Sequence, residues 1–211
     1  MTTRTELTRL PKRGSYDPAV IHAIVDEGLV CYVSYQVDGQ PFLIPTAYGR
    51  IGNTVYLHGS VGSHFFRELA KGVPVCVAVS LIDGLVLARS AFHHSVNYRS
   101  VVLFGTTQLV TDETERWAAL ERITEHLVPG RWTDTRPPNA SELKKTMVIA
   151  VPIEEASAKI RTGNVNDEPE DADLPHWAGV IPLRTQTGAP EQDPSQNPAI
   201  PTPAYVLDYE R

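Results

Sequence analysis

The sequence has 211 residues, a mass of 23.3 kDa, a formal net charge of -6 and a pI near 5.6. This length is enough for a buried core and favours one domain with appendages. The acidic balance argues against binding to nucleic acid or to an anionic membrane, because both partners require a basic protein surface.

The cysteines and the N-terminal residues indicate the cellular compartment of the protein. Cys31 and Cys76 each lie in an apolar, strand-like run, which favours buried, reduced thiols over disulfides or a zinc site. The N-terminal stretch MTTRTELTRLPKRGSYD lacks the apolar segment of a signal peptide. No later run approaches the roughly 18 apolar residues of a membrane span. We therefore expect a cytoplasmic protein.

The first third of the chain predicts a helix followed by a β-meander. Asp17 and Pro18 indicate a helix start, and the short amphipathic helix ends before Gly28. Three strand-like runs follow, separated by the turn signals Asp38-Gly39 and Gly52-Asn53. These strands are predicted at residues 29–37, 41–51 and 54–60.

The middle of the chain predicts two more helices between strands. Ser63 is expected to cap a helix over residues 63–71, and a capping box at 112–115 opens a helix that ends at Pro129-Gly130. Asp83-Gly84 is expected to turn the chain between two strands. The remaining strands are predicted at residues 73–82, 85–90, 98–110, 146–153 and 156–164.

Composition changes near the C-terminus. Residues 166–173 (NDEPEDAD) are acidic and lack an apolar anchor, so they predict a solvated loop. Residues 174–183 are apolar enough to dock on the body, whereas the proline-rich stretch after them should form neither regular sheet nor helix. The predicted organisation is an arm (1–14), a main domain (15–185) and a tail (186–211). Roughly seven or eight short strands with few helices favour a closed or nearly closed β-barrel.

The junction between strand 54–60 and the next helix is the first candidate site. Glycines and hydroxyls precede the helix start, where N–H groups without helical partners and a partial positive charge favour an anion such as phosphate. Strand-turn-helix junctions of this composition are common, so by itself the pattern favours an ordinary capped helix over an anion site.

Three blocks, at residues 41–69, 84–106 and 159–183, strengthen the phosphate interpretation. Their sequences and order resemble the pyridoxamine 5′-phosphate oxidase-related FMN-binding split-barrel proteins, in the branch near the nitroimidazole-resistance proteins. The resemblance covers roughly residues 15 to 185. It implies a mainly β fold, a split β-barrel with a six-stranded Greek-key core and flanking α-helices. It also implies a homodimer with FMN bound at the subunit interface.

The resemblance implies which residues contact the cofactor. In these relatives one strand runs along the flavin ring and contacts it through its backbone. The end of the next strand, the start of the helix that follows, a later strand and a tryptophan make the other contacts. Many relatives carry Arg or Lys where this chain has His64 and Phe65, so a titratable imidazole would hold the phosphate, helped by Arg67, Arg99 or Lys159. The expected cofactor-binding residues are Pro45, Thr46, Ala47, Tyr48, Leu57, His58, Gly59, Ser60, Ser63, His64, Tyr98, Arg99, Ser100, Val101 and Trp177.

Several of these residues have a structural alternative. His58 on a strand is as readily a structural histidine as a ligand. His93 and His94 invite a metal site, but neighbours on a strand point to opposite faces, so we expect no metal and one of the pair in the flavin pocket. Trp117 fits the apolar stripe of its helix, and Trp132 is expected to pack on that helix or at a dimer contact.

The resemblance, together with the absence of a recognisable nucleophile or zinc motif, implies an FMN-dependent oxidoreductase that acts on a small molecule and takes electrons from NAD(P)H or another donor. No residue is assigned a catalytic role. Pyridoxamine phosphate itself is a poor candidate, because the chain ends in a proline-rich tail instead of the arginine-rich motif of that oxidase. Two alternatives stay open: a flavin-binding module or sensor without turnover, and a split barrel that binds haem or a deazaflavin.

Overall fold

The structure is a computed structural model that describes residues 4–210. The chain forms two compact units, each built from several separate segments. Unit 1 comprises the chain up to Pro45, Pro74–Gly105 and Ile153–Arg184, and unit 2 comprises Thr46–Val73, Thr106–Pro152 and the chain from Thr185 onward. Strand β3 (Gln40–Ile51) begins in unit 1 and ends in unit 2.

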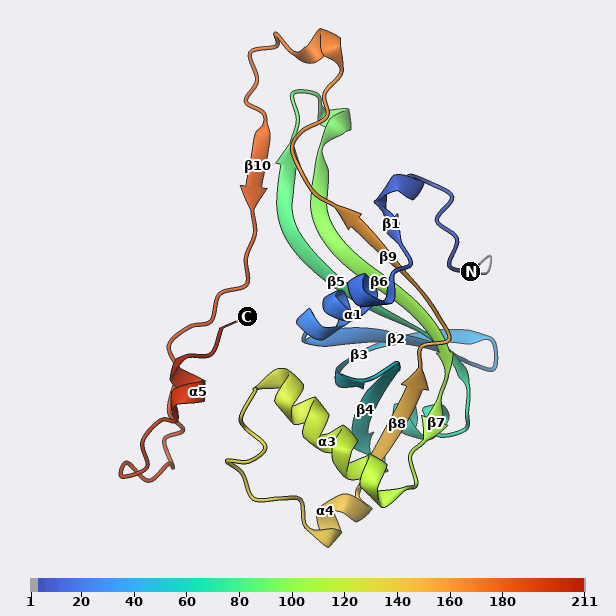
Figure 1. The fold of residues 1–211 in the computed structure, drawn as a ribbon, viewed down its shortest axis with the longest axis vertical. Helices are drawn as coiled ribbons and strands as arrows, with labels where there is room; N and C mark the ends of the chain where they lie inside the picture. Colours follow the sequence, from blue (N-terminus) through green and yellow to red (C-terminus); the bar gives the residue numbers. More distant parts are fainter. Residues whose placement is uncertain (1–3, 211) are drawn as a thin grey trace. The chain divides into compact units, whose positions relative to one another are not determined.

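Unit 1 is an antiparallel sheet with one α-helix (Figure 1). The helix, α1 (Pro18–Glu27), begins as predicted, with the Asp17 carboxylate accepting a hydrogen bond from the Ala19 N–H at 2.9 Å. Its strands pair in the order β1-β9-β6-β5-β2, and β10 also pairs with β5. Their bounds are β1 Gly14–Ser15, β2 Val30–Val37, β5 Pro74–Leu87, β6 Ser95–Thr106, β9 Glu155–Arg161 and β10 Gly179–Pro182. Short 3-10 helices span Pro11–Arg13 (η1), Ala91–His93 (η2) and Pro169–Asp171 (η3).

The turn expected at Asp83-Gly84 does not exist, because both residues lie within the continuous strand β5. The Asp83 carboxylate accepts hydrogen bonds from Arg99, which removes its tendency to bond its own backbone in a turn. Gly84 pairs with Pro182 of β10, and a Cβ at residue 84 would lie 3.0 Å from the Ile181 carbonyl oxygen. The absence of a side chain at residue 84 makes room for β10, which lies beside β5 (Figure 1).

The apolar segment 174–183 docks as predicted, since β10 forms within it and pairs with β5. The turn between β2 and β3 is also as predicted. Asp38 and Gly39 have φ angles of 48° and 82°, the positive values that a two-residue type I′ hairpin requires.

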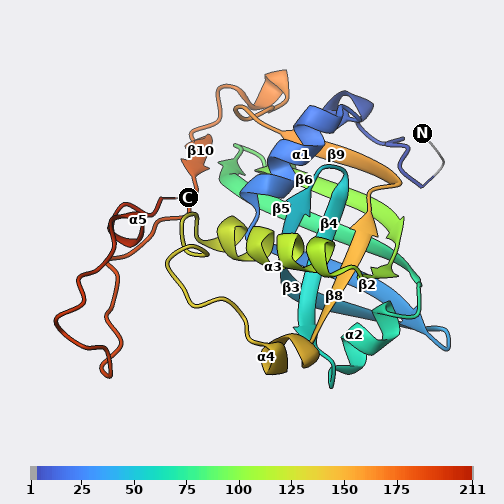
Figure 2. The same cartoon turned by 60° about the horizontal axis from the view of Figure 1, so that its bottom comes forward.

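Unit 2 is a smaller antiparallel sheet with strands in the order β3-β4-β8-β7, covered by helices. Its other strands are β4 (Thr54–Ser60), β7 (Gln108–Leu109) and β8 (Thr146–Pro152). The helices are α2 (His64–Leu69), α3 (Glu113–Leu127), α4 (Ala140–Lys144) and α5 (Ala204–Leu207). Figure 2 shows α3 lying across β4 and β8.

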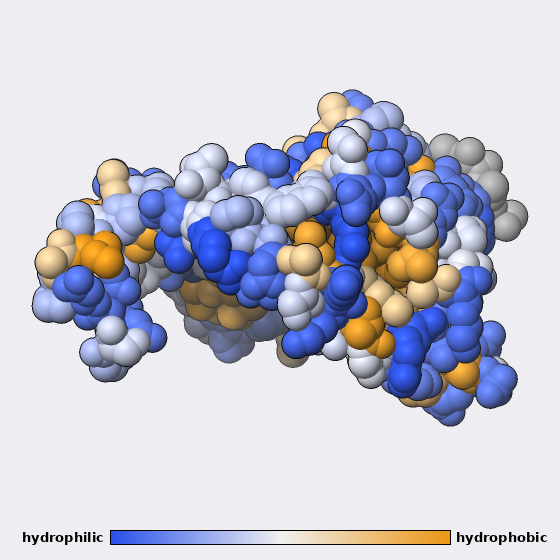
Figure 3. All heavy atoms as spheres, turned by 90° about the horizontal axis from the view of Figure 1, so that it is seen from below, coloured by the Kyte–Doolittle hydropathy of each residue, from blue (hydrophilic) through white to orange (hydrophobic). Residues whose placement is uncertain are grey.

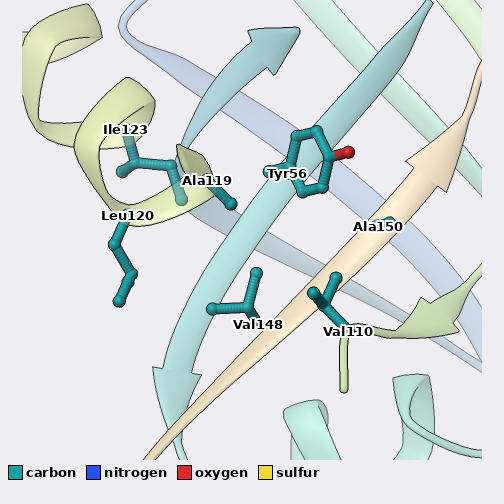
Figure 4. Packing of buried hydrophobic residues seen from close by; sticks show 7 residues of the cluster. All are labelled: Tyr56, Val110, Ala119, Leu120, Ile123, Val148 and Ala150. Atoms are coloured by element: carbon teal, nitrogen blue, oxygen red, sulfur yellow. The ribbon is translucent and has the colours of Figure 1, made fainter. Parts of the chain in front are cut away.

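The core of unit 2 lies between α3 and the sheet. Figure 4 shows its members, which come from β4, β8, α3 and the chain after β7: Tyr56, Val110, Ala119, Leu120, Ile123, Val148 and Ala150. Trp117 of α3 is half-buried and meets Trp132 edge to face at 6.0 Å, so Trp132 packs on the helix as expected. The helix start is capped by Asp112, which accepts from the Glu115 N–H at 2.8 Å. The Glu115 carboxylate accepts from the Tyr56 hydroxyl instead of completing the capping box.

No strand was predicted at β1 or β10 and no helix at α4 or α5, and the single strand predicted at 98–110 is divided into β6 and β7. The sequence does contain a start signal for helix α4, because Asn139 and Glu142 have the spacing of a capping box and form a complete one. The prediction that the tail forms no helix is wrong, because the four-residue helix α5 begins directly after Pro203, and proline is tolerated at a helix start.

Both cysteines are free thiols, as predicted, and Cys31 is buried. Within residues 4–210, no helix is both long enough and apolar enough to cross a bilayer. Several large apolar side chains are exposed, including Phe92 and Trp177 of unit 1. Figure 3 shows apolar patches separated by polar residues on the face that it presents.

Candidate functional site

The turn between β4 and α2, where a phosphate site was predicted, is ordered by hydrogen bonds of Ser60. The Ser60 hydroxyl accepts from the Gly62 N–H at 3.1 Å, and the Ser60 carbonyl accepts from the Ser63 N–H at 3.0 Å. Ser63 is the N-cap of α2, as predicted, but its hydroxyl makes no capping hydrogen bond. The turn therefore presents a hydroxyl and the first N–H groups of a helix.

His64 opens α2 with its side chain 59% exposed, and its Nε2 lies 3.7 Å from the Glu68 carboxylate. This carboxylate also accepts from Lys71 at 2.6 Å, and that hydrogen bond is the largest cause that lowers the pKa of Glu68. A ligand phosphate at His64 would therefore share the imidazole with a nearby anionic carboxylate.

Gly59 has a structural role in the packing of α2. A Cβ at residue 59 would lie 2.1 Å from Cε2 of Phe66, whose ring fills that space. Because α2 packs on β4 through this ring, glycine is required by the helix contact.

Tyr48 and Leu57 face each other across β3 and β4, and both are fully buried. The Tyr48 ring lies 4.8 Å from the ring of His126. The expectation that the Tyr48 ring packs on a flavin does not fit this structure, because the ring is enclosed by protein. Thr46 and Ala47, in the same strand, are half-buried.

His58 lines a cavity of about 290 Å³ beneath α3 and α4. Its Nδ1 is shielded from solvent and has no hydrogen-bond partner among residues 4–210. Burial lowers the pKa of His58, because desolvation disfavours the charged imidazolium. The cavity walls are Leu120, Thr124, Trp132, Pro138, Glu142, Leu143 and Thr146. The structure thus places His58 against helices α3 and α4 and makes it a neutral imidazole.

The candidate residues of unit 1 lie mainly on β6. Arg99 is held by two carboxylates: its Nε and Nη2 donate to Asp83 at 3.0 and 2.8 Å, and Nη2 also donates to Glu27 at 2.7 Å. Hydrogen bonds to Asp83 and then Glu27 raise the pKa of Arg99. Its guanidinium is therefore committed to an ion-pair network.

The neighbours of Arg99 take part in strand pairing. Ser100 donates from its hydroxyl to the Lys159 carbonyl at 3.3 Å, and Val101 is 1% exposed. Tyr98 is half-buried and pairs with Arg161 of β9. Pro45, the last residue of its segment of unit 1, is exposed.

The pattern of strands, helices and turn matches known proteins. The family model described as pyridoxamine 5′-phosphate oxidase matches residues 17–160. This chain belongs to that family. Its fold is the family's split barrel, mainly antiparallel β-sheet with a few helices.

Two solved structures resemble this family member along nearly its whole length. The flavocytochrome Anf3 from Azotobacter vinelandii is 40% identical, with a TM-score of 0.92, and the match covers 99% of this chain and 97% of that one. The FAD and haem binding protein from Mycobacterium smegmatis is 36% identical, with a TM-score of 0.88, and the match covers 92% of this chain and 95% of that one.

A third structure shares the fold. It is described as a candidate 5-nitroimidazole antibiotic resistance protein from Bacteroides thetaiotaomicron, 23% identical, with a TM-score of 0.59. That match covers 70% of this chain and 86% of the other. None of the curated proteins searched matches the chain.

This split-barrel protein has a further ordered turn at His93 and His94, the pair expected to be neighbours on a strand. Residues 91–93 form η2, and His94 ends it, so the two histidines are not strand neighbours. The segment expected to be a solvated loop anchors this turn. Asp167 accepts from the backbone and the side chain of Arg89 at 3.1 and 2.8 Å, and Glu168 lies 3.6 Å from His93 Nε2.

Trp177 of this family member is 68% exposed and packs against Gly179, where a Cβ would lie 2.8 Å from its ring. Within residues 4–210, no group of three or more His, Cys, Asp or Glu side chains is arranged to hold a metal ion. A larger cavity of about 940 Å³ lies between the end of α3 and the tail, lined by residues such as Val128, Arg131 and Tyr209. Nothing in the sequence pattern pointed to this cavity, because the tail has no periodicity that predicts its path.

Proposed function

We propose that this protein is a flavocytochrome, which binds a flavin and a haem and passes electrons between them. The supporting observation is the extent of the likeness to two proteins, one described as a flavocytochrome and the other as binding FAD and haem. Those matches cover 99% and 92% of this chain, well beyond residues 17–160 of the family match. The proposal takes up the haem alternative from the sequence analysis and keeps the flavin.

The residues of the β4–α2 turn fit a flavin nucleotide. The Ser63 hydroxyl makes no capping hydrogen bond, and the imidazole of His64 is exposed. The start of the helix favours an anion. We propose that these groups bind the flavin phosphate. The family resemblance implied FMN, whereas the Mycobacterium smegmatis relative is described as binding FAD, so we propose FAD as the flavin.

The histidines fit a haem. The chain has seven histidines. One of them, His94, is exposed, and its Nδ1 is held by a backbone carbonyl. When bound, a flavin supplies two-electron chemistry and a haem iron supplies one-electron chemistry, and the protein determines their position and surroundings. Electrons would enter from NAD(P)H or another donor and leave to a small-molecule acceptor.

A homodimer is part of the proposal. Unit 1 exposes large apolar side chains along β5 and β10 and the turns beside them: Ile82, Leu85, Phe92, Trp177 and Ile181 are each at least 39% exposed. Such side chains are typical of a surface that is covered in an assembly. Light scattering of the purified protein should give twice the mass of the chain.

The deciding experiment is an absorption spectrum of the untagged protein purified from cells supplied with a haem precursor. Flavin bands together with a Soret band are expected, and FAD should bind more tightly than FMN in a titration of the flavin-free protein. Reduction by NADPH or NADH that bleaches the flavin and shifts the haem bands would support an oxidoreductase. Flavin bands that no donor bleaches would support a binding module or sensor, and absence of both chromophores would overturn the proposal.

The flavin site has its own test. The double variant Ser63→Ala/His64→Ala should bind flavin at least about tenfold more weakly, since it removes a hydroxyl and an imidazole from one charge-assisted phosphate contact. Circular dichroism should show an unchanged fold, because neither side chain is buried. An unchanged affinity in the folded variant would remove the turn from the flavin site.

A further inference from the structure

The turn at residues 89–94 of unit 1 is held rigidly for a segment at the surface. The Ser90 hydroxyl accepts from the Phe92 N–H at 3.3 Å, and the Ser90 carbonyl accepts from the His93 N–H at 3.1 Å. On one side Arg89 is tied to Asp167, and on the other β6 begins at Ser95. A rigid support of this kind is what a binding residue requires for its side chain to keep one position.

His94 has its ring orientation fixed by the same serine. Its Nδ1 lies 3.1 Å from the Ser90 carbonyl oxygen. A carbonyl can only accept, so Nδ1 must carry the proton, and Nε2 of the neutral ring then carries the lone pair. The His94 residue is exposed, so this lone pair belongs to a ring that a ligand can reach.

This arrangement is the one that metal-binding histidines show. Such histidines donate their second ring N–H to a backbone carbonyl, a carboxylate or water, which fixes the tautomer and raises the basicity of the coordinating nitrogen. The other histidines with described contacts differ: His64 and His93 lie beside carboxylates, and His126 is 2% exposed.

The surroundings of His94 suit a haem better than a bare metal ion. No group of three or more metal-ligating side chains is arranged around a common point within residues 4–210, and a bare ion would need such a group. A haem supplies four nitrogens itself and needs only one or two ligands from the protein. Phe92, two residues before His94, is 88% exposed, and its ring meets that of His93 edge to face at 5.2 Å, so the turn also carries an accessible apolar ring.

We propose that His94 is an axial ligand of the haem iron through Nε2, and that Ser90 positions it. The proposal rests on the proposed function, because it presupposes that the protein binds haem. It adds the residue that holds the iron and the turn that orients this residue.

The test uses the full chain without a histidine tag, titrated with hemin and followed by the Soret band and by electron paramagnetic resonance. His94→Gly should bind hemin at least about tenfold more weakly than the wild type, since loss of an outer-shell partner alone costs 10- to 100-fold. Added imidazole should restore the wild-type spectrum of His94→Gly. His93→Ala is the matched control and should keep the wild-type affinity and spectrum, because its ring lies beside Glu168.

Each outcome has one meaning. Wild-type protein that takes up no hemin would overturn the proposed function and the ligand together. Wild-type protein that binds hemin, with an unchanged spectrum in folded His94→Gly, would overturn the ligand alone, as would loss of haem in His93→Ala. If circular dichroism shows that His94→Gly is unfolded, His94→Gln is used, and the same two readouts decide.

Discussion

The ring of Phe66 occupies the space that a Cβ of residue 59 would need, with the nearest ring carbon 2.1 Å away. Gly59 and Phe66 together fix α2 on β4, and they place the turn that we assign to the flavin phosphate. A contact between one glycine and one buried ring therefore sets the position of the candidate flavin site.

The first prediction concerns this contact. Gly59→Ala should lower the free energy of unfolding by about 1–3 kcal/mol, the usual cost of overpacking a core. Because the clash is with the ring, the double variant Gly59→Ala/Phe66→Leu should lose less than the sum of the two single changes. Urea unfolding of all four proteins measures both effects, and strictly additive losses would show that the ring and the glycine are independent.

The second prediction concerns Tyr56, whose hydroxyl donates to Glu115 at 2.8 Å beneath α3. Burial, followed by the interaction with Glu115, raises the pKa of Tyr56 to about 12. Tyr56→Phe should cost about 1 kcal/mol, since the hydrogen bond is lost while the ring remains. Because the pKa is raised, the contribution of this hydrogen bond to the free energy of unfolding is present below about pH 10 and disappears as the pH rises towards 12. Wild type and variant should therefore converge in stability at high pH, and a constant difference would contradict this assignment.

The third prediction follows from the buried imidazole of His58. Its pKa is lowered in the folded protein, so the unfolded chain binds a proton more readily as the pH falls through the ordinary value of about 6.5. The folded state therefore loses stability as the pH decreases. Wild type should lose more unfolding free energy than His58→Gln between about pH 7.5 and 5.5, because only the wild type carries this group. The other histidines are common to both proteins, so equal pH slopes would contradict a buried neutral His58.

The fourth prediction concerns Arg99, which joins β6 to Asp83 and to Glu27 at the end of α1. Arg99→Lys should lower the free energy of unfolding by about 1–2 kcal/mol, because an ammonium cannot reproduce the paired contacts of a guanidinium. Glu27→Gln should cost less, since the Glu27 side chain is 52% exposed. Chemical denaturation measures both, and a larger loss from Glu27→Gln would reverse the assigned order. If Arg99 acts only in this network, Arg99→Lys should bind flavin as tightly as the wild type.

The sequence alone predicts the features that depend on neighbouring residues. The start of α1 at Asp17-Pro18, the turn at Asp38-Gly39 and the N-cap of α2 at Ser63 were predicted correctly. In each case the deciding interaction joins residues close together in the chain, so local chemistry is sufficient. The family and its mainly β split-barrel fold were also predicted, because their blocks of residues are contiguous.

Only the tertiary structure decided the matters that depend on distant residues. Asp83 looks like a turn residue until Arg99 engages it, and only the fold shows that the Phe66 ring needs the space beside Gly59. The acidic segment is mostly exposed, as predicted, but only the fold shows that its Asp167 meets Arg89, which lies 78 residues earlier in the chain. The tautomer of His94 depends on a carbonyl at the start of its own turn, and that turn was not predicted. Composition and periodicity determine which elements form, whereas the role of each polar group is decided by the partner that folding brings to it.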